Sequence, residues 1–290
     1  VIIDEASMMD LMLMGAVCRA LKPESRLIMT GDVDQLPSVG AGNVLGDLIE
    51  SGYIYTSRLT EIYRQESESK IVLNAHRINQ GRYPEYGGDF VLVSADKQQE
   101  ILQKIIELAP LDQVQVLTPT KKGILGSLNL NENLQKVFNP PGKEKAEISF
   151  GAKIYRTGDR VMQIKNNYRL EYRRKDGKSG KGIFNGETGT VSAVYPDDRK
   201  LVVEYDDDRW VEYPYVQLDE IELAYAVTVH KSQGSEFPVV IIPMSWFPPA
   251  LATRNLIYTA VTRGKRKVVI VGRGDYFNAM VDNVQTGRRN

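Results

Sequence analysis

Two adjacent carboxylates, Asp4 and Glu5, directly follow the apolar run Val1-Ile2-Ile3. Three branched apolar residues predict a short strand that is buried on both faces, as strands of parallel sheets are. The carboxylates would then lie at the carboxyl end of the strand, where open parallel sheets bind ligands. One carboxylate there can hold Mg²⁺ directly or through water, and the other can orient or deprotonate a water that attacks a phosphate. A strand followed by an acidic helix N-terminus is the simpler alternative, because Asp and Glu favour that end of the helix dipole.

A second concentration of special residues follows the apolar run Leu27-Ile28-Met29, which predicts another buried strand. The loop 30–43 contains the pair Gly31-Asp32, then Gln35, then the small residues Gly40-Ala41-Gly42. A turn needs one or two glycines, whereas this many small residues permits close approach of the backbone to a ligand. A glutamine at a strand end suits the sensing of a phosphate or of its attacking water, so Gln35 is a candidate site residue.

A third polar stretch is the run Thr228 to Glu236, which reads TVHKSQGSE and precedes the buried strand Val239-Val240-Ile241-Ile242. A lone histidine in such a place is most often structural. Here His230 stands among lysine, serine, glutamine and glycine. Many hydrogen-bond donors beside a core are costly unless something polar binds there, so this stretch is a candidate ligand site.

The elements that position these residues alternate between helix and strand. Hydrophobic periodicity predicts a helix from Leu11 to Leu21, with Ser7 or Asp10 as its cap, and a helix from Ser67 to Asn79. The later predicted elements are a strand and helix within Phe90 to Pro110, a strand from Val114 to Leu117, a helix marked by Leu125, Leu128, Leu130 and Leu134, a helix from Asn255 to Arg263, and a strand from Val268 to Val271 that closes the sheet. This alternation predicts an α/β fold with parallel sheets.

The pattern changes character around Gly151 and resumes at Leu223. Alternating, β-rich segments between turn residues predict a small antiparallel barrel or sheet, inserted into the second α/β unit. Its predicted strands are Arg160 to Ile164, Thr190 to Val194, Leu201 to Tyr205 and Trp210 to Tyr213.

Within this insert the stretch Arg169 to Gly182 carries six basic and two acidic residues, with Tyr172 among them. One hypothesis is a flexible hairpin that contacts the backbone of a nucleic acid. A solvated loop is the alternative, because runs of charge are usually exposed surface.

Composition limits the class of protein. A length of 290 residues with 42% apolar content favours about two globular domains. No run approaches the roughly 18 apolar residues of a membrane span, and no basic-then-apolar leader is present. Because a core strand starts at Val1 without a preceding Met, we expect part of the protein to lie outside this sequence.

Cysteine and charge counts exclude other classes. Cys18 is the single cysteine, so an internal disulfide is excluded and a cytoplasmic setting fits. With only His76 and His230 beside it, a structural zinc site is excluded on ligand count. The 37 basic residues balance 37 acidic ones, so any nucleic-acid surface must be local.

The chain contains six motif-like segments in this order: VIIDEAS, TGDVDQLPSVGAGNVL, LTEIYRQ, LTPTKK, AVTVHKSQGSEF and NLIYTAVTRGK. They resemble the successive helicase motifs, from the Walker B motif onward, of superfamily 1 helicases. The chain resembles the RecD-like group most closely, whose relatives include the conjugative TraA proteins. The insert, with GDRVMQIKNN and FNGETGTV, resembles the SH3-like domain of that group.

The resemblance implies a role for each motif residue. Asp4 would coordinate Mg²⁺, Glu5 would activate the attacking water, and Gln35 would sense the γ-phosphate of ATP. Two arginine fingers would stabilise charge on the transferring phosphoryl group. These fingers would be Arg64 and Arg263, while Gly234 would approach the nucleotide and Glu236 would bond its ribose. The phosphate backbone of single-stranded DNA would be held by Thr118, Thr228 and His230, with Lys231 as a helper.

The resemblance also implies a domain plan. Residues 1–56 would be the end of a first RecA-like motor domain, and residues 57–152 with 219–290 a second. Residues 153–218 would form the inserted SH3-like barrel. The first motor domain would be incomplete, because the chain contains no G-x-x-x-x-G-K-[ST] loop to cradle phosphates. We therefore expect the chain to hydrolyse almost no ATP by itself.

The function implied is that of an ATP-dependent DNA helicase, which moves 5′ to 3′ on single-stranded DNA and unwinds duplex at single-strand/double-strand junctions during repair or recombination. The residues do not specify partner subunits. Two alternatives stay open. One is a nucleotide-independent module that binds DNA or a protein, in which the motor residues are relics. The other is the motor part of a conjugative relaxase.

Overall fold

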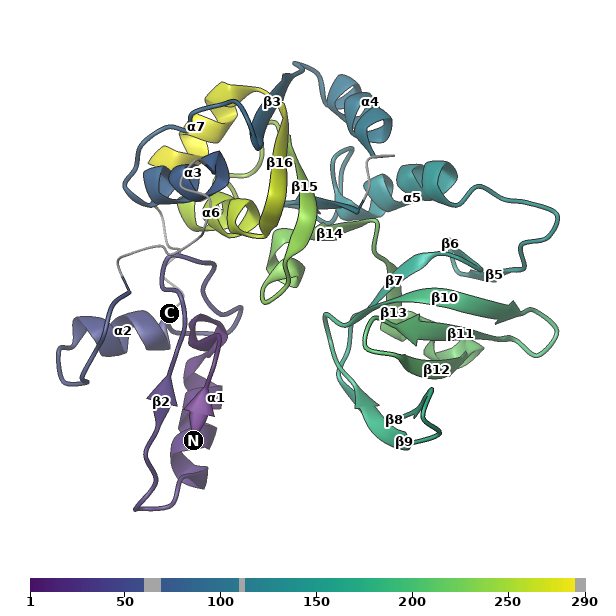
Figure 1. Cartoon of the computed structure of the whole chain (residues 1–290), viewed down its shortest axis with the longest axis horizontal. Helices are drawn as coiled ribbons and strands as arrows, with labels where there is room; N and C mark the ends of the chain where they lie inside the picture. The colour runs from purple at the N-terminus through teal and green to yellow at the C-terminus, as the bar shows by residue number, and fades with distance from the viewer. Residues whose placement is uncertain (60–68, 110–112, 285–290) are drawn as a thin grey trace. The chain divides into compact units, whose positions relative to one another are not determined.

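The computed structural model describes residues 1–59, 69–109 and 113–284 of the chain (Figure 1). They form two compact units, one of Val1–Asp96 with Ser232–Asn290 and one of Lys97–Lys231. The sequence-based domain boundaries divide the chain differently and stay a prediction. Among the described residues, no helix is both long enough and apolar enough to span a bilayer.

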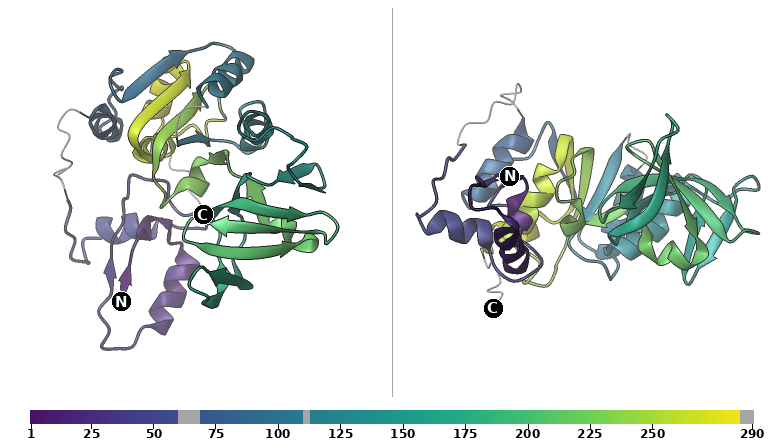
Figure 2. Two further views of the ribbon diagram at one scale, coloured as in Figure 1. Left: turned by 45° about the vertical axis from the view of Figure 1, so that its right-hand side comes forward. Right: turned by 90° about the horizontal axis from the view of Figure 1, so that it is seen from below.

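The first segment of the first unit is a small parallel pair, visible in Figures 1 and 2 with helix α1 beside it. Strand β1 (Ile2–Ile3) pairs with β2 (Ile28–Met29). Helix α1 (Leu11–Ala20) has Asp10 as its N-cap, and Oδ1 of Asp10 accepts a hydrogen bond from the backbone N–H of Leu13 at 2.7 Å. The segment also contains a short 3₁₀ turn, η1 (Ala6–Met8), and helix α2 (Val44–Glu50). The predicted cap at Asp10 is confirmed.

The expected burial of these two strands is wrong. Ile2 is 72% exposed and Ile28 is 54% exposed. A strand is buried on both faces only when a layer covers each face of its sheet. In the described part of the chain, β1 and β2 pair only with each other, and α1 buries none of its residues.

The rest of the first unit is a parallel α/β layer. Strands β3 (Phe90–Ser94), β15 (Phe237–Met244) and β16 (Gly264–Gly272) run parallel, with β16 between the other two. The runs VVII in β15 and VVIV in β16 are buried, as strands covered on both faces are. Helices α3 (Lys70–Asn79), α6 (Arg254–Thr262) and α7 (Gly274–Asp282) pack on this layer. The last predicted strand is therefore central to this layer and does not close it.

The second unit begins with a second parallel pair. Helix α4 (Gln98–Leu108) precedes strand β4 (Val114–Thr118), which pairs with β14 (Ala226–Thr228). Helix α5 (Ser127–Phe138) follows β4. The register places Thr118 opposite Thr228 at the carboxyl ends of the two strands. The predicted strand at Val114 to Leu117 and the helix after it are confirmed.

The remainder of the second unit is antiparallel, as predicted. Seven strands form one sheet in the order β13-β7-β10-β11-β12-β8-β9, and two more strands pair with each other. The antiparallel region runs from Glu147 to Leu223, longer than the expected 153–218. The seven are β7 (Arg160–Gln163), β8 (Asn167–Arg174), β9 (Ser179–Ile183), β10 (Thr188–Tyr195), β11 (Lys200–Tyr205), β12 (Arg209–Pro214) and β13 (Ile221–Leu223), with η2 (Tyr215–Glu220) before β13; the separate pair is β5 (Glu147–Phe150) and β6 (Lys153–Arg156).

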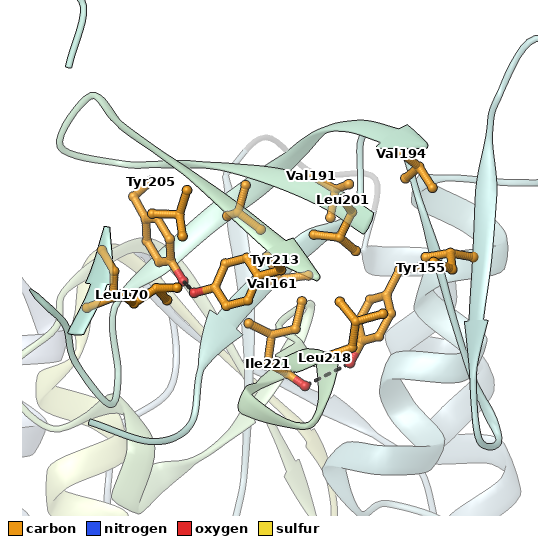
Figure 3. Packing of buried hydrophobic residues seen from close by; sticks show 14 residues of the cluster. Tyr155, Val161, Leu170, Val191, Val194, Leu201, Tyr205, Tyr213, Leu218 and Ile221 are labelled. Carbon is orange, nitrogen blue, oxygen red and sulfur yellow. Dashed lines mark hydrogen bonds between the residues drawn. The ribbon is translucent and has the colours of Figure 1, made fainter. Parts of the chain in front are cut away.

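The core of this insert is apolar but includes buried tyrosines (Figure 3). The hydroxyls of Tyr205 and Tyr213 lie 2.6 Å apart, and that of Tyr213 donates to Oε1 of Gln163 at 2.7 Å. The Tyr155 hydroxyl donates to the carbonyl oxygen of Ile221 at 2.7 Å. Because each buried hydroxyl has a partner, the rings add apolar area to the core without an unsatisfied polar atom.

A buried carboxylate joins the insert to α5. Asp159 is fully buried and accepts hydrogen bonds from the side chains of Gln135 on α5 and of Asn139, the C-cap of that helix, both at 2.7 Å. It also accepts from the backbone N–H of Arg156 at 2.6 Å and from the hydroxyl of Tyr225 at 2.9 Å. A buried charge is tolerated only when it is fully hydrogen-bonded, as it is here. Asp159 therefore fixes the insert against α5.

Candidate functional site

Asp4 and Glu5 follow β1 directly, as the sequence predicted. Asp4 is exposed, and its Oδ1 accepts hydrogen bonds from Oγ1 of Thr30 at 2.5 Å and from the backbone N–H of Glu5 at 3.0 Å. The hydrogen bond from Thr30, then that from Glu5, lowers the pKa of Asp4, so this carboxylate is ionised at neutral pH. Glu5 has a left-handed backbone (φ 51°), a conformation of the kind that costs about 1–3 kcal/mol and concentrates at functional sites.

The donor set fits a magnesium ion that is shared with a nucleotide. Among the residues that the structure describes, no group of three or more His, Cys, Asp or Glu side chains is arranged so that it could hold a metal ion by itself. Mg²⁺ is commonly held by one or two carboxylates together with phosphate oxygens and waters, so it does not need such a cluster. Asp4, ionised and exposed, meets this requirement.

Gln35 is held by a carboxylate that sequence reasoning missed. Its side chain is buried, and Nε2 donates to Oδ2 of Asp32 at 3.1 Å. The hydroxyl of Tyr258, on α6, donates to the same oxygen at 2.9 Å. Burial, then the negative charge of Asp32, raises the pKa of Tyr258, so the hydroxyl keeps its proton. Asp32 thus orients Gln35, and Tyr258 orients Asp32.

Arg263 lies at the C-terminal cap of α6 and faces the same place. It is 5% exposed, and its Nη2 donates to Oε1 of Gln35 at 3.1 Å. Burial lowers its pKa, and the charges of Glu5, Glu236 and Asp32 oppose that shift, so the three carboxylates lie within electrostatic reach of the guanidinium. The arrangement brings a buried arginine and a glutamine together, in the electrostatic field of the predicted catalytic carboxylate.

Further hydrogen bonds join the loop after β2 to the later part of the same unit. The backbone N–H of Leu36 donates to Oγ1 of Thr259 on α6 at 2.8 Å, and Nε2 of Gln233 donates to the carbonyl of Leu36 at 2.7 Å. Nδ2 of Asn255 donates to the carbonyl of Asp34 at 3.0 Å. The loop that carries Gln35 is therefore positioned by side chains about 200 residues further along. Gln233 belongs to the candidate stretch Thr228 to Glu236, whereas Thr259 and Asn255 were not singled out from the sequence.

Gly234 and Glu236 stand just before β15. Gly234 has a left-handed backbone (φ +75°) with open space where a Cβ would lie, so its conformation, not crowding, requires glycine. Glu236 is exposed and pairs with Lys265 at 2.7 Å. Their assigned contacts with nucleotide stay predictions.

The predicted DNA-contacting residues fall in the second unit. Thr118 and Thr228 are neighbours in the β4–β14 register, and His230 and Lys231 lie on the 3₁₀ turn η3 (Val229–Ser232) that follows. Thr118 is fully buried, and its hydroxyl donates to the carbonyl of Leu125 at 2.6 Å. It therefore supports the strand end in this structure, while its DNA contact stays a prediction. Arg64 lies outside the described residues.

The basic stretch forms a hairpin, as hypothesised, from β8 and β9. Several of its charges are paired with carboxylates: Lys181 with Glu171 at 2.9 Å, and Arg174 with Asp207 at 3.5 Å. Exposed pairs of this kind contribute little to stability. They leave the hairpin less basic than its composition indicates.

Comparison with known proteins places three family models along the chain. Residues 130–205 match the SH3 domain of ATP-dependent RecD-like DNA helicases, and residues 223–271 match the UvrD-like helicase C-terminal domain. Residues 1–93 match an AAA domain. The SH3 match overlaps the antiparallel insert, and the other two flank it.

Relatives of the whole chain are longer proteins. The ATP-dependent RecD2 DNA helicase of Deinococcus radiodurans is 35% identical over 275 residues, which cover 93% of this chain and 36% of that protein. The RecD subunit of the RecBCD enzyme of Mycolicibacterium smegmatis is 29% identical over 295 residues, which cover 94% of this chain and 50% of that protein. The chain thus spans about half or less of these relatives.

Solved structures share the fold. The Pif1 helicase from Bacteroides in complex with ADP-AlF3 and single-stranded DNA superposes with a TM-score of 0.56 at 20% identity, over 93% of this chain and 69% of that one. The Pif1 helicase from Candida albicans superposes with a TM-score of 0.53 at 16% identity, over 99% of this chain and 73% of that one. At such identities the likeness establishes the fold alone.

Proposed function

The chain belongs to the RecD-like superfamily 1 helicases, and we propose that it is the part of an ATP-dependent DNA helicase that senses the terminal phosphate of ATP and grips single-stranded DNA. One observation carries this proposal: Arg263 and Gln35 are hydrogen-bonded to each other, within electrostatic reach of Glu5. An arginine, a glutamine and a carboxylate are the groups that phosphoryl transfer to water requires.

Each residue of this group has a separate task. Glu5 accepts a proton from the attacking water and orients it. Gln35 offers its amide to the γ-phosphate or to that water, and Asp32 holds the amide in position. Arg263 supplies positive charge where negative charge develops, an effect worth about 10³ to 10⁵ in rate for arginine fingers. Mg²⁺ held by Asp4 would neutralise charge on the phosphate oxygens.

The Arg263–Gln35 hydrogen bond supports a coupling between hydrolysis and motion. Gln35 follows β2, in the segment of the first motor domain, whereas Arg263 ends α6 of the second. A ligand that binds one arrangement of two segments more tightly than another shifts the population toward that arrangement. A γ-phosphate between Gln35 and Arg263 would replace their mutual bond by two bonds to itself. Its departure would restore the bond.

DNA would be held by the second unit. Thr228 ends β14, His230 and Lys231 lie on the turn η3 that follows, and Thr118 lies beside Thr228. Polar groups at the carboxyl ends of adjacent parallel strands can contact successive phosphates of a strand. We propose 5′ to 3′ movement, unwinding at single-strand/double-strand junctions, and a role in repair or recombination in the cytoplasm.

Hydrolysis needs a phosphate-cradling loop, and the 290 residues contain no G-x-x-x-x-G-K-[ST] sequence. We therefore expect ATP turnover only from a protein that carries such a loop together with this chain, and almost none from the chain by itself. Steady-state turnover by the 290-residue chain that Glu5→Gln abolishes would contradict this expectation.

The experiment that tests the function is ATP hydrolysis by the loop-containing protein with and without single-stranded DNA. A helicase motor shows hydrolysis that DNA stimulates and that Glu5→Gln removes. The alternative, a nucleotide-independent binding module, predicts DNA binding at defined stoichiometry without stimulation of hydrolysis. The intact set of Glu5, Gln35 and Arg263, joined by hydrogen bonding and charge, favours the motor.

A further inference from the structure

Three lysines surround one carboxylate in the second unit. Nζ of Lys121 lies 2.6 Å from Oε1 of Glu222, Nζ of Lys231 lies 3.1 Å from Oε2, and Nζ of Lys153 lies 3.9 Å from Oε1. The four residues come from four segments: the loop after β4, strand β6, strand β13 and the turn η3. The fold therefore assembles this cluster from residues that are distant in sequence.

The charges of this cluster do not balance. Three ammonium groups against one carboxylate leave a formal charge of +2 (3 − 1). The Glu222 side chain is only 15% exposed, and the lysines are 28% to 49% exposed. Burial lowers the pKa of Lys153, Glu222 opposes that shift, and the neighbouring charges of Lys121 and Lys231 add to it. A structural ion pair needs one lysine, so the other two are held together against their mutual repulsion.

The cluster adjoins a small pocket that already contains a predicted DNA residue. Glu222, Lys231 and Thr228 line this pocket with the polar side chains of Ser127 and Asn131. Thr228 lies three residues before Lys231, at the end of β14. Lys231 and the predicted phosphate-contacting Thr228 thus border one pocket with Glu222, on which Lys121 and Lys153 also converge.

We propose that Lys121, Lys153 and Lys231 form a seat for one backbone phosphate of single-stranded DNA, and that the Glu222 carboxylate occupies this seat until DNA binds. The inference rests on the proposed function and adds Lys121, Lys153 and Glu222 to it. A phosphate oxygen accepts the same charge-assisted hydrogen bonds from ammonium groups as a carboxylate oxygen does. On binding, the lysines exchange Glu222 for the phosphate, which competes with the carboxylate for the same donors.

This arrangement gives lysine and glutamate substitutions opposite effects on DNA. Removing a lysine removes one ammonium group from the phosphate, so affinity falls. The slope of log affinity against log salt concentration becomes shallower by about 0.7 for each phosphate of a single strand that is no longer neutralised. Removing the carboxylate removes a competitor and adds about one net positive charge, so Glu222→Gln binds DNA more tightly, with a steeper slope. If the cluster only stabilises the packing of the insert on the rest of the second unit, DNA binding should be weaker, or unchanged, in both the lysine and the glutamate variants.

The test is fluorescence anisotropy with an unstructured oligonucleotide, at several salt concentrations, on the full 290-residue chain. Lys121→Gln, Lys153→Gln and Glu222→Gln are compared with Lys153→Arg, which keeps the charge. Lys136→Gln is the matched control, because Lys136 pairs with Glu132 on the exposed surface of α5. Circular dichroism establishes that each variant is folded. If Glu222→Gln does not fold, Glu222→Ala, which also removes the carboxylate and its charge, is used in its place.

The expected result is weaker binding with a shallower slope for the two lysine-to-glutamine variants, wild-type binding for Lys153→Arg and Lys136→Gln, and tighter binding for the Glu222 variant. Equal slopes in all variants, or weaker binding by the Glu222 variant, would overturn the phosphate seat. If the wild-type chain binds DNA and the variants match it, the seat alone is rejected. If the wild-type chain binds no single-stranded DNA at any salt concentration, the proposed function itself fails.

Discussion

Nη2 of Arg263 donates a hydrogen bond to Oε1 of Gln35 at 3.1 Å, although 228 residues separate them. Arg263 is also anchored by the carbonyl oxygens of Ser235, at 3.0 Å from Nη1, and Thr259, at 3.3 Å from Nε. Gln35 is anchored by Asp32. Each partner is thus oriented by other groups of the chain, and groups held in place in this way reduce the reorganisation that catalysis would otherwise require.

Arg263→Ala is expected to collapse ATP hydrolysis, by about 10³ or more as for other arginine fingers, in a protein that carries the phosphate-binding loop with this chain. DNA affinity should stay within about twofold, because Arg263 belongs to the nucleotide side of the proposed site. The matched control is Arg273→Ala, which removes an exposed arginine paired with Asp275. Equal loss of hydrolysis and DNA binding by Arg263→Ala would contradict the finger assignment.

Tyr258→Phe is expected to slow hydrolysis without weakening ATP binding. The change removes the hydroxyl that donates to Asp32, so Asp32 holds Gln35 less firmly. A hydrogen bond to a charged group contributes about 1.5–3 kcal/mol, so kcat should fall about tenfold or more while KM for ATP changes little. Tyr276→Phe on α7 serves as the control. An increase in KM alone would show that Tyr258 contributes to binding and does not position Gln35.

Glu222→Gln is expected to change how stability depends on pH. Burial raises the pKa of Glu222, but the hydrogen bonds and charges of Lys121 and Lys231 outweigh it, and the net pKa lies below the ordinary 4.5. Between the folded-state pKa and the ordinary value of 4.5, the Glu222 carboxyl therefore binds fewer protons in the folded state than in the unfolded state. The stabilisation is present above pH 4.5 and is lost as the pH falls through the folded-state pKa.

Urea denaturation at several pH values between about 7 and 3 measures this effect. The wild-type chain should be more stable than Glu222→Gln at neutral pH, and the difference should shrink toward acid pH. The control is Glu132→Gln, which removes an exposed pair on α5. A difference that stays constant with pH would rule out the ionised Glu222 carboxylate as its source.

Asp159→Ala is expected to destabilise the second unit by at least about 3 kcal/mol, because it leaves several buried donors without an acceptor. Gln135, Asn139 and Tyr225 all donate to this carboxylate. Asp198→Ala, in an exposed turn, should change stability by less than about 0.5 kcal/mol. Similar denaturation midpoints for the two variants would show that Asp159 does not fix the insert to α5.

Local sequence patterns predicted the elements whose type and burial follow from their own residues. The four-residue apolar runs of β15 and β16 are buried, and the alternation in β11 and β12 matches an antiparallel sheet. Burial of Ile2 could not be predicted in this way, because it depends on which elements cover a strand. The motif order singled out Gln35 and Arg263, and the structure joins them by a hydrogen bond. Their roles toward a nucleotide stay predictions.

Side-chain partners remote in sequence were not predictable. Asp32 and Tyr258 are 226 residues apart, and no local rule relates them. The hydroxyl of Thr118 donates to the carbonyl oxygen of Leu125, a partner that no local pattern indicates, and its DNA contact stays a prediction. The lysine cluster on Glu222 also arises only from the folded arrangement of four segments.

The most direct measurement is displacement of one strand from a partial duplex by the loop-containing protein, with ATP, with no nucleotide, and with Glu5→Gln in place of the wild type. A duplex with a 5′ single-stranded tail and one with a 3′ tail are compared. The account predicts ATP-dependent separation of the 5′-tailed duplex and none by Glu5→Gln. Separation that proceeds equally without ATP, or that Glu5→Gln retains in full, would contradict it.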